Sequence, residues 1–416
     1  MSRLDELIAE LCPDGVKYEP LWKVTIWDKK FNGVDRCKQP YTICYPYLLA
    51  NELFDLEQES GDVFLLSTGE RIGFTTEELA GKYICEGEIV AIPWGKSRPV
   101  AEVIKYYNGK FVTADNRIVT SIDKMILLNK FLFYWMTSEG KKIDIFYRGS
   151  GIKHPSMKDI LEMRIPIPPL PVQEEIVRIL DNFAELTAEL TAELTAELAK
   201  RKQQYQYYCD KLIYHHMDGD KFSVTKVGDI ARFTYGYTEK AQDVGAARFI
   251  RITDITEDGC LNSINAKYVN LTKDNKRYLL KKGDILMART GATYGKTVCI
   301  PNDAPAIYAS FLIKISLDNT KIINRFYWHF SRSSMYWLQA NNLASKGGQP
   351  QFNSNVLCKV LMPIPPLKEQ ERIVAILDRF DALCNDLASG LSAEIEARKK
   401  QYEYYRDKLL TFKEAV

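Results

Sequence analysis

IPIPPLPVQEEIVRILDNFAEL, residues 165–186, returns as MPIPPLKEQERIVAILDRFDAL at residues 362–383, an offset of 197 positions. The same offset, without a gap, relates RKQQYQYYCDKLI at 201–213 to RKKQYEYYRDKLL at 398–410. Self-similarity at a fixed spacing marks a repeated structural unit. The chain therefore consists of two copies of a unit of roughly 200 residues.

Upstream of these blocks the two halves resemble each other less but keep nearly the same spacing. GEIVAIPWGK from Gly87 pairs with GDILMARTGA from Gly283, and SIDKMILLNKFLFYW from Ser121 pairs with SLDNTKIINRFYWHF from Ser316. Within each unit the front part thus diverges, whereas the back part is nearly identical. We infer that the back parts share one task and that the front parts differ in theirs.

The front parts consist of short β-branched and aromatic runs bounded by Gly, Asn and Asp, a pattern typical of strands. The runs are DVFLLST (62–68), EIVAIP (88–93), AEVIKYY (101–107), RIVTSI (117–122), FIRITDI (249–255), GDILMA (283–288), KTVCIP (296–301) and FLIKIS (311–316). Aromatic spacing predicts one helix in each front part, near 127–141 and 322–338. The predicted fold class is α+β, with two tandem α/β domains that each contain an irregular sheet.

Each back part opens with a proline-rich string that cannot be the interior of a helix, because consecutive prolines remove donors and favour extended geometry. Pro171 and the acidic residues after it suit the first turn of a helix. Apolar residues then recur at steps of three or four, which predicts a coiled-coil-like seam. We expect long helices from about Val172 to Tyr214 and from about Lys368 to Thr411, each roughly 63 Å long, with Gly390 weakening the second.

The first long helix contains the four-residue repeat AEL-TAEL-TAEL-TAEL at residues 184–198. This repeat spaces Leu186, Leu190, Leu194 and Leu198 at steps of four. Because four residues turn through roughly 400°, the leucine stripe drifts about 40° per step. Two interpretations stay open: simple amphipathic low complexity, or a spacer whose length can change with the number of repeats.

Composition excludes several other classes of protein. With 46% hydrophobic residues among 416, the chain can bury a sizeable core and disorder is not expected. The longest apolar stretch, residues 125–136, falls short of the roughly 20 residues of a membrane span, and the N-terminus is acidic where a signal peptide is basic. The nine cysteines form no CxxC pair, so we predict reduced thiols and a cytoplasmic protein without a metal site.

Charge is distributed unevenly between the two front parts. Residues 17–164 carry 21 Lys and Arg against 20 Asp and Glu, whereas residues 221–361 carry 20 against 10. The first front part is therefore nearly neutral, and the second has a net charge of +10. A basic excess of this kind favours an anionic partner for the second front part.

The duplicated PIPPL blocks, the two YxYYxDKL segments and the N-terminal SRLDELIAELCPDGVKYEPL resemble the specificity subunits of type I restriction-modification systems across nearly the whole chain. The TAEL run resembles the type IC branch of that family. The resemblance implies target-recognition domains at 1–164 and 217–361, and spacer helices at 165–216 and 362–416. It also implies that these helices pack as an antiparallel coiled coil with a pseudo-two-fold relation between the halves.

The same resemblance implies partners and division of labour. Each domain would read one half of a split, asymmetric site in double-stranded DNA, and the helices would set the gap. Two modification (methyltransferase) subunits would dock on the helices and methylate an adenine in each half-site with S-adenosylmethionine. Restriction (translocase and nuclease) subunits would use ATP and Mg²⁺, so this chain itself would hold no cofactor.

Two loops in each front part offer side chains suited to DNA: arginine for guanine, amides for adenine edges, a ring for stacking and lysine for phosphate. The candidates in the first half are Trp94, Lys96, Arg98, Arg148 and Lys153. Those in the second half are Arg289, Thr290, Tyr294, Lys296, Lys346, Gln349, Gln351 and Asn353. The alternative interpretation is a glycine-rich hairpin turn or an ordinary loop with solvated charges.

No motif supports catalysis by this chain. TGATYGKT at 290–297 resembles a phosphate loop, but its glycines enclose three residues where GxxxxGK[ST] needs four. No NPPY-like methyltransferase tetrapeptide is present, Pro13-Asp14 lacks an acidic-x-Lys at nuclease spacing, and His215-His216 falls in a polar join. The sequence thus predicts a non-catalytic chain.

Three alternatives stay open at this point. A fused enzyme with an undetected catalytic site would transfer methyl groups without partners. A coiled-coil scaffold would explain the helices but not the divergent, unequally charged front parts. The tyrosines of the two YxYY segments can serve the helix-helix core or a docking face.

Overall fold

The computed structural model describes residues 2–69, 71–96, 98–214, 223–345 and 350–415. Two compact units are present: unit 1 comprises Met1–Thr191 with Ala393–Val416, and unit 2 comprises Ala192–Ser392. Each unit contains one front part and a segment of both long helices. The predicted positions Lys346, Gln349 and His215-His216 lie outside the described residues.

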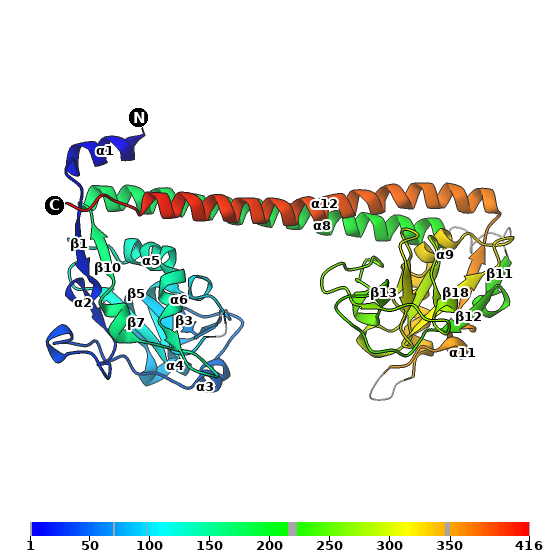
Figure 1. Ribbon diagram of the computed structural model, residues 1–416, viewed down its shortest axis with the longest axis horizontal. Helices are drawn as coiled ribbons and strands as arrows, with labels where there is room; N and C mark the ends of the chain where they lie inside the picture. Colours follow the sequence, from blue (N-terminus) through cyan, green and yellow to red (C-terminus); the bar gives the residue numbers. More distant parts are fainter. Residues whose placement is uncertain (1, 70, 97, 215–222, 346–349, 416) are drawn as a thin grey trace. The chain divides into compact units, whose positions relative to one another are not determined.

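Unit 1 contains short helices and strands that precede the first long helix in the chain (Figure 1). Its helices are α1 (Arg3–Leu11), α2 (Leu21–Val24), α3 (Ala50–Asp55), α4 (Glu77–Ala80), α5 (Asn129–Ser138), α6 (Gly140–Ile145) and α7 (Met157–Leu161). Its strands are β1 (Lys17–Pro20), β2 (Thr25–Trp27), β3 (Val63–Leu66), β4 (Phe74–Thr75), β5 (Cys85–Pro93), β6 (Lys105–Thr113), β7 (Asn116–Ser121), β8 (Tyr147–Arg148), β9 (His154–Pro155) and β10 (Arg164–Ile167).

Unit 2 has a comparable set of elements, and the two long helices contribute to both units. Its strands are β11 (Ser223–Lys226), β12 (Ala231–Tyr235), β13 (Ala247–Ile250), β14 (Tyr268–Val269), β15 (Ile285–Ala288), β16 (Thr297–Cys299), β17 (Ala306–Tyr308), β18 (Leu312–Leu317) and β19 (Leu361–Ile364). Its helices are α9 (Asn324–Phe330), α10 (Ser334–Leu343) and α11 (Ser354–Leu357). The long helices are α8 (Leu170–Tyr214) and α12 (Leu367–Leu409).

Mixed sheets form the centre of each front part. Unit 1 has a six-stranded sheet in the order β2-β7-β5-β6-β3-β4, in which only the β3–β6 pair is parallel. Unit 2 has a four-stranded antiparallel sheet, β12-β18-β15-β16, and a three-stranded sheet, β14-β13-β17. All eight predicted runs overlap one of these strands, so the α+β prediction is confirmed.

Strand alternation explains how each central strand serves two cores. In β5, Val90 and Ile92 join the large core beneath α5, whereas Ile89 and Ala91 join a separate core on the opposite face. In unit 2 the same alternation divides β15, whose Ile285 and Met287 pack with α9 while its other two residues pack away from it. Both faces of each central strand are buried, which is why these runs read as continuous apolar stretches.

The proline-rich strings are extended, as predicted. β10 pairs antiparallel with β1, placing Pro166 opposite Tyr18, and β19 pairs with β11, placing Pro363 opposite Val224. Each pair is a separate two-stranded ribbon, where a residue that lacks an amide hydrogen is tolerated. Each ribbon carries the chain from its domain into a long helix.

The two predicted long helices are present, with 45 residues in α8 and 43 in α12. Within each unit they lie side by side and run in opposite directions (Figure 1). In unit 1 the rings of Phe183 and Tyr405 lie 5.8 Å apart, and in unit 2 the rings of Phe380 and Tyr208 lie 5.0 Å apart. These two contacts involve the same residue types at positions related by the 197-residue offset.

The leucines of the TAEL run do not share one environment. Leu186 is 64% exposed, whereas Leu190, Leu194 and Leu198 are half-buried. The half-buried positions alternate with Thr187 and Thr191, whose hydroxyls donate to carbonyls of their own helix. The predicted drift of the leucine stripe away from a single seam is consistent with this pattern.

One prediction about the front parts was wrong. Each has two consecutive helices in place of the single helix expected near 127–141 and 322–338. In unit 2, Ser331 and Ser333 donate to carbonyls of α9, and Ser333 then caps α10. In unit 1 the second helix starts at Gly140, where a Cβ would lie 2.7 Å from that of Ala101. Aromatic spacing alone predicted one continuous helix in each front part. Serine capping divides it in unit 2, and the close approach of Gly140 to Ala101 divides it in unit 1.

Within the described ranges, helix length and hydropathy give no candidate for a membrane span. The nine cysteines are all unpaired, and no group of three His, Cys, Asp or Glu side chains in the same ranges is arranged to hold a metal ion.

Candidate nucleic-acid interface

The structure brings the two candidate loops of each half together. In unit 1, Lys96 of the loop after β5 forms an antiparallel β-bridge with Lys153 of the β8–β9 turn. In unit 2, Thr290 of the loop after β15 forms the same kind of bridge with Gln351, just before α11. Each bridge joins the loop after a central strand to a segment that precedes the two-stranded ribbon, β1–β10 in unit 1 or β11–β19 in unit 2. We call these the loop pairs of units 1 and 2.

The two candidate lysines of the unit 1 loop pair differ in environment. The Lys96 side chain is only 10% exposed, forms an ion pair with Asp144 and lies over the ring of Tyr147. Burial, and then the charge of nearby Lys153, lowers the pKa of Lys96. Lys153 is exposed. Lys153 can therefore reach an external anion, whereas Lys96 supports the loop from within.

The indole of Trp94 contacts the side chains of Arg117 and His154. The Arg117 guanidinium lies 3.9 Å from the indole centroid, and the His154 ring lies 4.5 Å from it. His154 Nδ1 is 2.9 Å from the carbonyl oxygen of Trp94, which holds the two loops of the pair together. The half-buried indole is thus held rigidly, with Lys153 and His154 beside it.

The other two candidates of unit 1 are at the surface. Arg98 is exposed. Arg148 is 72% exposed and forms an ion pair of 3.0 Å with Asp159. An exposed pair of this kind contributes little to stability, so Arg148 can exchange its partner for a phosphate at low cost.

The loop after β15 is a hairpin turn that connects β15 to β16. Gly291 and Gly295 have φ angles of +73° and +76°, which explains why glycine occupies both positions. The amide of Gly295 donates to the carbonyl of Ala288, closing the hairpin at 2.8 Å. The backbone therefore matches the glycine-rich hairpin of the alternative interpretation, and no phosphate loop forms.

Arg289 lies at the surface of this hairpin between two aromatic rings. Its guanidinium is 5.4 Å from the ring centroids of both Tyr235 and Phe311, and its Nε donates to the carbonyl of Ser310. Tyr235 is 40% exposed and Phe311 51% exposed. Nε is the atom of the Arg289 guanidinium that donates to Ser310, and the two rings restrict the side chain. This arrangement suits a preorganised bidentate donor.

The remaining candidates of unit 2 are largely engaged within the domain. Thr290 is buried, and the Tyr294 hydroxyl donates to Asn341. Lys296 lies 3.6 Å from Glu257, and Asn353 caps α11 by accepting from the amide of Val356. Gln351 is exposed.

Four residues of the two sites were not predicted from the sequence: Arg117, His154, Tyr235 and Phe311. Arg117 lies in the predicted strand run 117–122, and Tyr235 lies on β12, which none of the predicted runs covers. His154 adjoins the predicted Lys153 and could have been included on that ground. Phe311 is the first residue of the predicted strand run 311–316, so its exposure was not evident.

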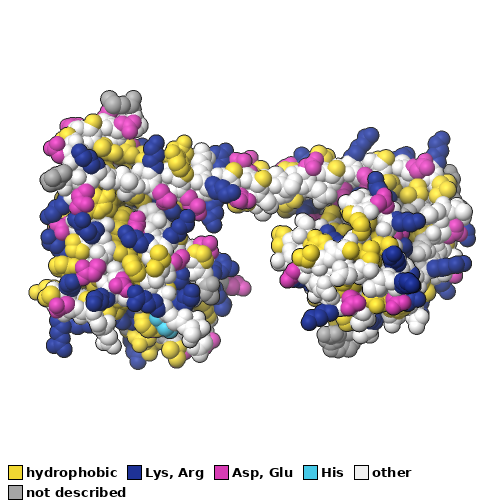
Figure 2. All heavy atoms as spheres, in the orientation of Figure 1, with side chains coloured by type: hydrophobic (Ala, Val, Ile, Leu, Met, Phe, Trp, Pro, Cys, Tyr) yellow, Lys and Arg dark blue, Asp and Glu magenta, His cyan; other side chains and the backbone are white. Residues whose placement is uncertain are grey.

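The charged side chains on the face seen in Figure 2 do not gather in one patch. In Figure 2, Lys and Arg side chains are spread over the visible face of both units with Asp and Glu among them. Many basic residues form ion pairs, such as Lys267 with Asp243 and Lys314 with Asp284. These pairs leave the net charge of +10 in the second front part unchanged, but they engage some of its basic side chains, so position matters more than total charge.

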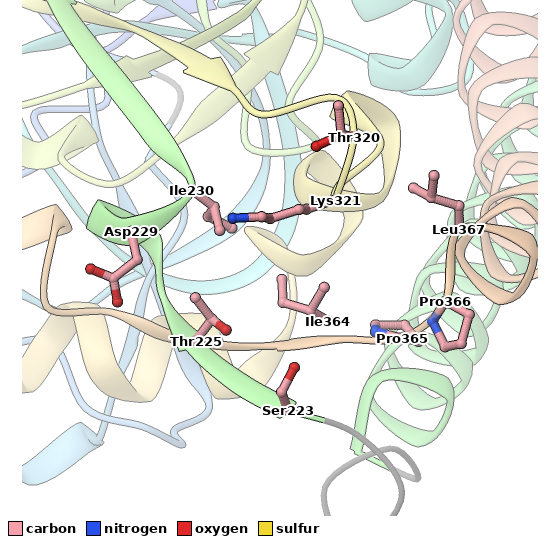
Figure 3. A pocket seen from close by; sticks show the side chains of 10 residues that line it. All are labelled: Ser223, Thr225, Asp229, Ile230, Thr320, Lys321, Ile364, Pro365, Pro366 and Leu367. Atoms are coloured by element: carbon pink, nitrogen blue, oxygen red, sulfur yellow. The ribbon is translucent and has the colours of Figure 1, made fainter.

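A pocket of about 550 Å³ in unit 2 lies away from the loop pair, at the junction with α12 (Figure 3). β11, β19, the turn before α9 and the first residue of α12 line it. The Lys321 side chain extends into it, and the Lys321 carbonyl accepts from Gln370 of α12. This pocket is part of the attachment of the domain to its helix.

Comparisons with known proteins agree with this architecture. The family model described as type I restriction modification DNA specificity domain matches residues 53–200 and again 219–397. The chain belongs to this family. A Haemophilus influenzae protein named as a type I restriction enzyme specificity subunit is 34% identical over 79% of this chain and 84% of its own length. The EcoR124I/EcoR124II specificity subunit of Escherichia coli is 29% identical over 99% of this chain and 97% of its own length.

A solved structure shows the same fold. One chain of a type I restriction-modification system, described in terms of complex assembly and conformational transition, superposes with a TM-score of 0.63 at 15% identity, covering 96% of this chain and 98% of that chain. The specificity subunit is thus a DNA-recognition chain with two copies of its domain, and it is not a catalytic subunit. The fused-enzyme and scaffold alternatives are not needed.

Proposed function

We propose that the loop pairs of units 1 and 2 read two different half-sites of one asymmetric DNA sequence, and that α8 and α12 set the gap between them. The observation that carries this proposal is the recurrence of the same bridged loop pair on both duplicated frames with different side chains. Unit 1 presents Lys153, Arg98 and Arg148, whereas unit 2 presents Arg289 and Gln351. A non-palindromic target requires two domains that share one fold but present different side chains on their loop pairs.

The proposal extends to the partners implied by the family. Two modification subunits bind this chain and methylate an adenine in each half-site with S-adenosylmethionine, and restriction subunits use ATP and Mg²⁺, all in the cytoplasm. The TAEL run supports assignment of the chain to the type IC branch. The support for this part is family membership together with the duplication of the helices.

Arg289 provides the sharpest test of the reading site. We expect Arg289→Ala to relax specificity at one position of one half-site, because a bidentate arginine–guanine contact discriminates by about 1–3 kcal/mol. Mapping of methylated adenines in cells that carry the variant with its partners returns both half-sites and the gap. Arg148→Ala is the matched control, since loss of a phosphate contact weakens binding and reduces its salt dependence without changing the sequence read.

A substitution in one unit should change the specificity at one half-site and leave the other half-site unchanged. Relaxation in both half-sites, or in neither, after Arg289→Ala would contradict the assignment of one half-site to unit 2. Arg289→Lys keeps the charge but not the bidentate fork, so it should restore affinity without restoring discrimination.

Deletion of one TAEL repeat tests the role of the helices. One repeat adds roughly 6 Å of helix, against roughly 3.4 Å of rise per base pair. We expect the gap to shorten by one or two base pairs while both half-sequences stay the same. Altered half-sequences in the methylation map would exclude a pure spacer role.

A further inference from the structure

Three side chains at the loop pair of unit 1 form a cluster in which exposure increases from one member to the next. The guanidinium of Arg117 lies 3.9 Å from the ring centroid of Trp94, and the ring of His154 lies 4.5 Å from the same centroid. The Arg117 side chain is 7% exposed, Trp94 is half-buried and His154 is exposed. We call this set the Arg–Trp–His cluster. Its most accessible member is the imidazole of His154.

The Arg117 guanidinium is fixed from within the domain. Its Nη1 donates to Asp115 at 2.8 Å and to the carbonyl of Asn116, and Asp115 also accepts from Lys29. Its Nε is buried and has no hydrogen-bond partner in the part of the chain that the structure describes. Buried donors are nearly always paired, so an unpaired one needs a reason. The contact with Trp94 supplies that reason, because cation–π attraction holds a guanidinium against an indole.

The backbone and one hydrogen bond fix the imidazole of His154. His154 precedes Pro155, which favours extended backbone, and it pairs with Arg148 across the β8–β9 turn. Its Nδ1 lies 2.9 Å from the carbonyl oxygen of Trp94. A Cβ at Gly95 would lie 3.7 Å from its Cε1, so the ring also lies close to the backbone of the loop after β5. Both loops of the unit 1 loop pair thus set the orientation of the ring.

The hydrogen bond to Trp94 determines which ring nitrogen of His154 is available to a ligand. A carbonyl oxygen only accepts, so Nδ1 carries the proton and donates. In the neutral ring Nε2 is then an acceptor. No residue that the structure describes forms a hydrogen bond with Nε2. His154 therefore presents one oriented acceptor on an exposed ring.

Unit 2 presents the opposite hydrogen-bonding character at its loop pair. There the guanidinium of Arg289 lies 5.4 Å from the ring centroids of Tyr235 and Phe311, and a guanidinium has donors only. In both units, aromatic contacts restrict one polar side chain beside the bridged loops. That side chain is a donor in unit 2 and an acceptor in unit 1, so the two units should select different bases.

We propose that His154 is a specificity-determining residue, whose Nε2 accepts a hydrogen bond from the exocyclic amino group of an adenine or a cytosine in the major groove. The inference rests on the proposed function, in which the unit 1 loop pair reads one half-site. Adenine N6 and cytosine N4 are the amino groups of the major groove, whereas guanine presents only acceptors there. Arg117 and Trp94 are positioning residues, because they act on the base through the imidazole.

The experiment measures DNA binding by the full-length chain assembled with its modification subunits. The methylation map first supplies the two half-sites. Duplexes of that sequence are then prepared in which one adenine at a time is replaced by purine, or one cytosine by 2-pyrimidinone, so that a single amino group is lost. Because this loss also weakens the base pair, each effect on the native chain is compared with the effect of the same replacement on a variant.

Two variants of neighbouring residues provide that comparison. His154→Asn retains an amide that can donate to the carbonyl of Trp94 but lacks an acceptor at the position of Nε2. Lys153→Ala is the matched control, since it removes an exposed cation from the same turn. It should weaken binding to every duplex by a common factor, as expected for a lost phosphate contact, and keep the native sensitivity to each base.

For one base of the unit 1 half-site, we expect loss of the amino group to weaken binding by the native chain about 10-fold more than binding by His154→Asn. His154→Gln, whose Oε1 can replace Nε2, should recover part of this difference. Arg117→Lys keeps a cation beside Asp115 but loses the planar guanidinium, so it should reduce the difference without abolishing binding. The unit 2 half-site should stay the same in every variant, which shows that the variants are folded and assembled.

Three outcomes would overturn the inference or its basis. Equal sensitivity of the native chain and His154→Asn to every amino group would exclude His154 as the reading residue. If His154→Asn instead lost a native sensitivity to 7-deazaguanine, the ring would donate to guanine N7 and the acceptor assignment would be wrong. A methylation map without two half-sites, or one in which His154→Asn alters the half-site that depends on Arg289, would contradict the proposed function itself.

Discussion

The junctions between the domains and the long helices are built on one frame but carry different chemistry. In both units a buried glutamine near the helix start, Gln173 or Gln370, accepts from one domain amide and donates to one domain carbonyl and one ribbon carbonyl. Beyond the glutamine the units diverge. In unit 1, Asp181 accepts from Tyr134 and Lys130. In unit 2, Asp378 contacts His329 and Arg325.

Among the described residues, unit 2 adds a second layer of charge at this junction that unit 1 lacks. The Trp328 indole lies between the guanidiniums of Arg325 and Arg332, at 3.8 and 4.3 Å from its centroid. Arg332 forms an ion pair of 2.7 Å with Asp381, whose counterpart in unit 1 is Ala184. Unlike the neutral glutamine frame, this network depends on the charge state of its members. The two domains should therefore respond differently to mutation and to pH.

Asp381→Ala should have the largest effect. Asp381 is 6% exposed, and its removal leaves the guanidinium of Arg332, itself 14% exposed, without its carboxylate. Breaking a buried pair in this way costs about 3–5 kcal/mol. Hydrogen exchange measured by mass spectrometry should show lost protection in α9 and α10 and unchanged protection in α5.

The matched control is Ala184→Asp, which introduces the same carboxylate at the exposed counterpart in unit 1. It should leave exchange in both units unchanged, because an exposed charge there displaces no buried partner. Equal loss of protection in α5 and α9 after Asp381→Ala would show that the two junctions are not energetically independent.

Acid should weaken unit 2 before unit 1. Burial lowers the pKa of His329 to about 4, and the neutral ring lies 2.8 Å from both the Tyr205 hydroxyl and the Asp378 carboxylate. An unfolded histidine takes up a proton near pH 6.5, so the stability contributed by neutral His329 is complete above that pH and is lost as the pH falls towards 4. The loss amounts to up to about 3 kcal/mol.

The charged neighbours of His329 do not reverse this sign. Burial raises the pKa of Asp378, but hydrogen bonds from His329 and Arg325 outweigh it and lower the pKa, so Asp378 also loses its stabilising contribution only on acidification. Arg325 and Arg332 remain charged throughout this range. Protection factors in α9, which correct for the intrinsic slowing of exchange in acid, should fall between pH 6.5 and 4 by more than those in α5, where Tyr134 does not titrate. His329→Gln should remove the difference, and its persistence would assign the acid response to another group.

The shared frame predicts an equal response in both units. Gln173→Ala and Gln370→Ala each remove three hydrogen bonds to buried or part-buried backbone groups, which should cost about 2–4 kcal/mol in the unit concerned. The two costs should agree within about 1 kcal/mol, as judged by exchange in α5 and α9. Gln203→Ala, at an exposed glutamine of α8, is the control and should have no effect. A clear difference between the two variants would mean that the charged network of unit 2 supports its frame as well.

The sequence was sufficient for the features that depend on short-range patterns. Short β-branched and aromatic runs bounded by turn residues identified β5 and β15 as strands, and apolar residues recurring at steps of three or four identified the long helices. The break at Ser331–Ser333 was missed because a serine hydroxyl that donates to its own helix leaves no periodic signal. The same limit applies to Gly140, whose close contact is with Ala101 in another element.

The candidate site was predictable only in part for a related reason. The loops were recognised by composition, but the bridges Lys96–Lys153 and Thr290–Gln351 join segments distant in sequence, and no local pattern specifies such contacts. Lys96 was expected to face a phosphate, yet Asp144 of α6 holds it inside the domain. Partners from other elements thus decide which candidate cations are available, and a single sequence does not supply them.

The smallest expected effect concerns the middle of the long helices, where Gly390 of α12 corresponds to Glu193 of α8. A Cβ at Gly390 would have no heavy atom within 4 Å, so alanine fits without strain and reduces the freedom of the unfolded chain. Gly390→Ala should stabilise α12 by about 0.5–1 kcal/mol, and Glu193→Gly should destabilise α8 by a similar amount, both read as shifts in a denaturant midpoint. If Gly390→Ala instead lowered stability, or changed the gap in a methylation map, the glycine would be required for bending and the two helices would not be equivalent rods.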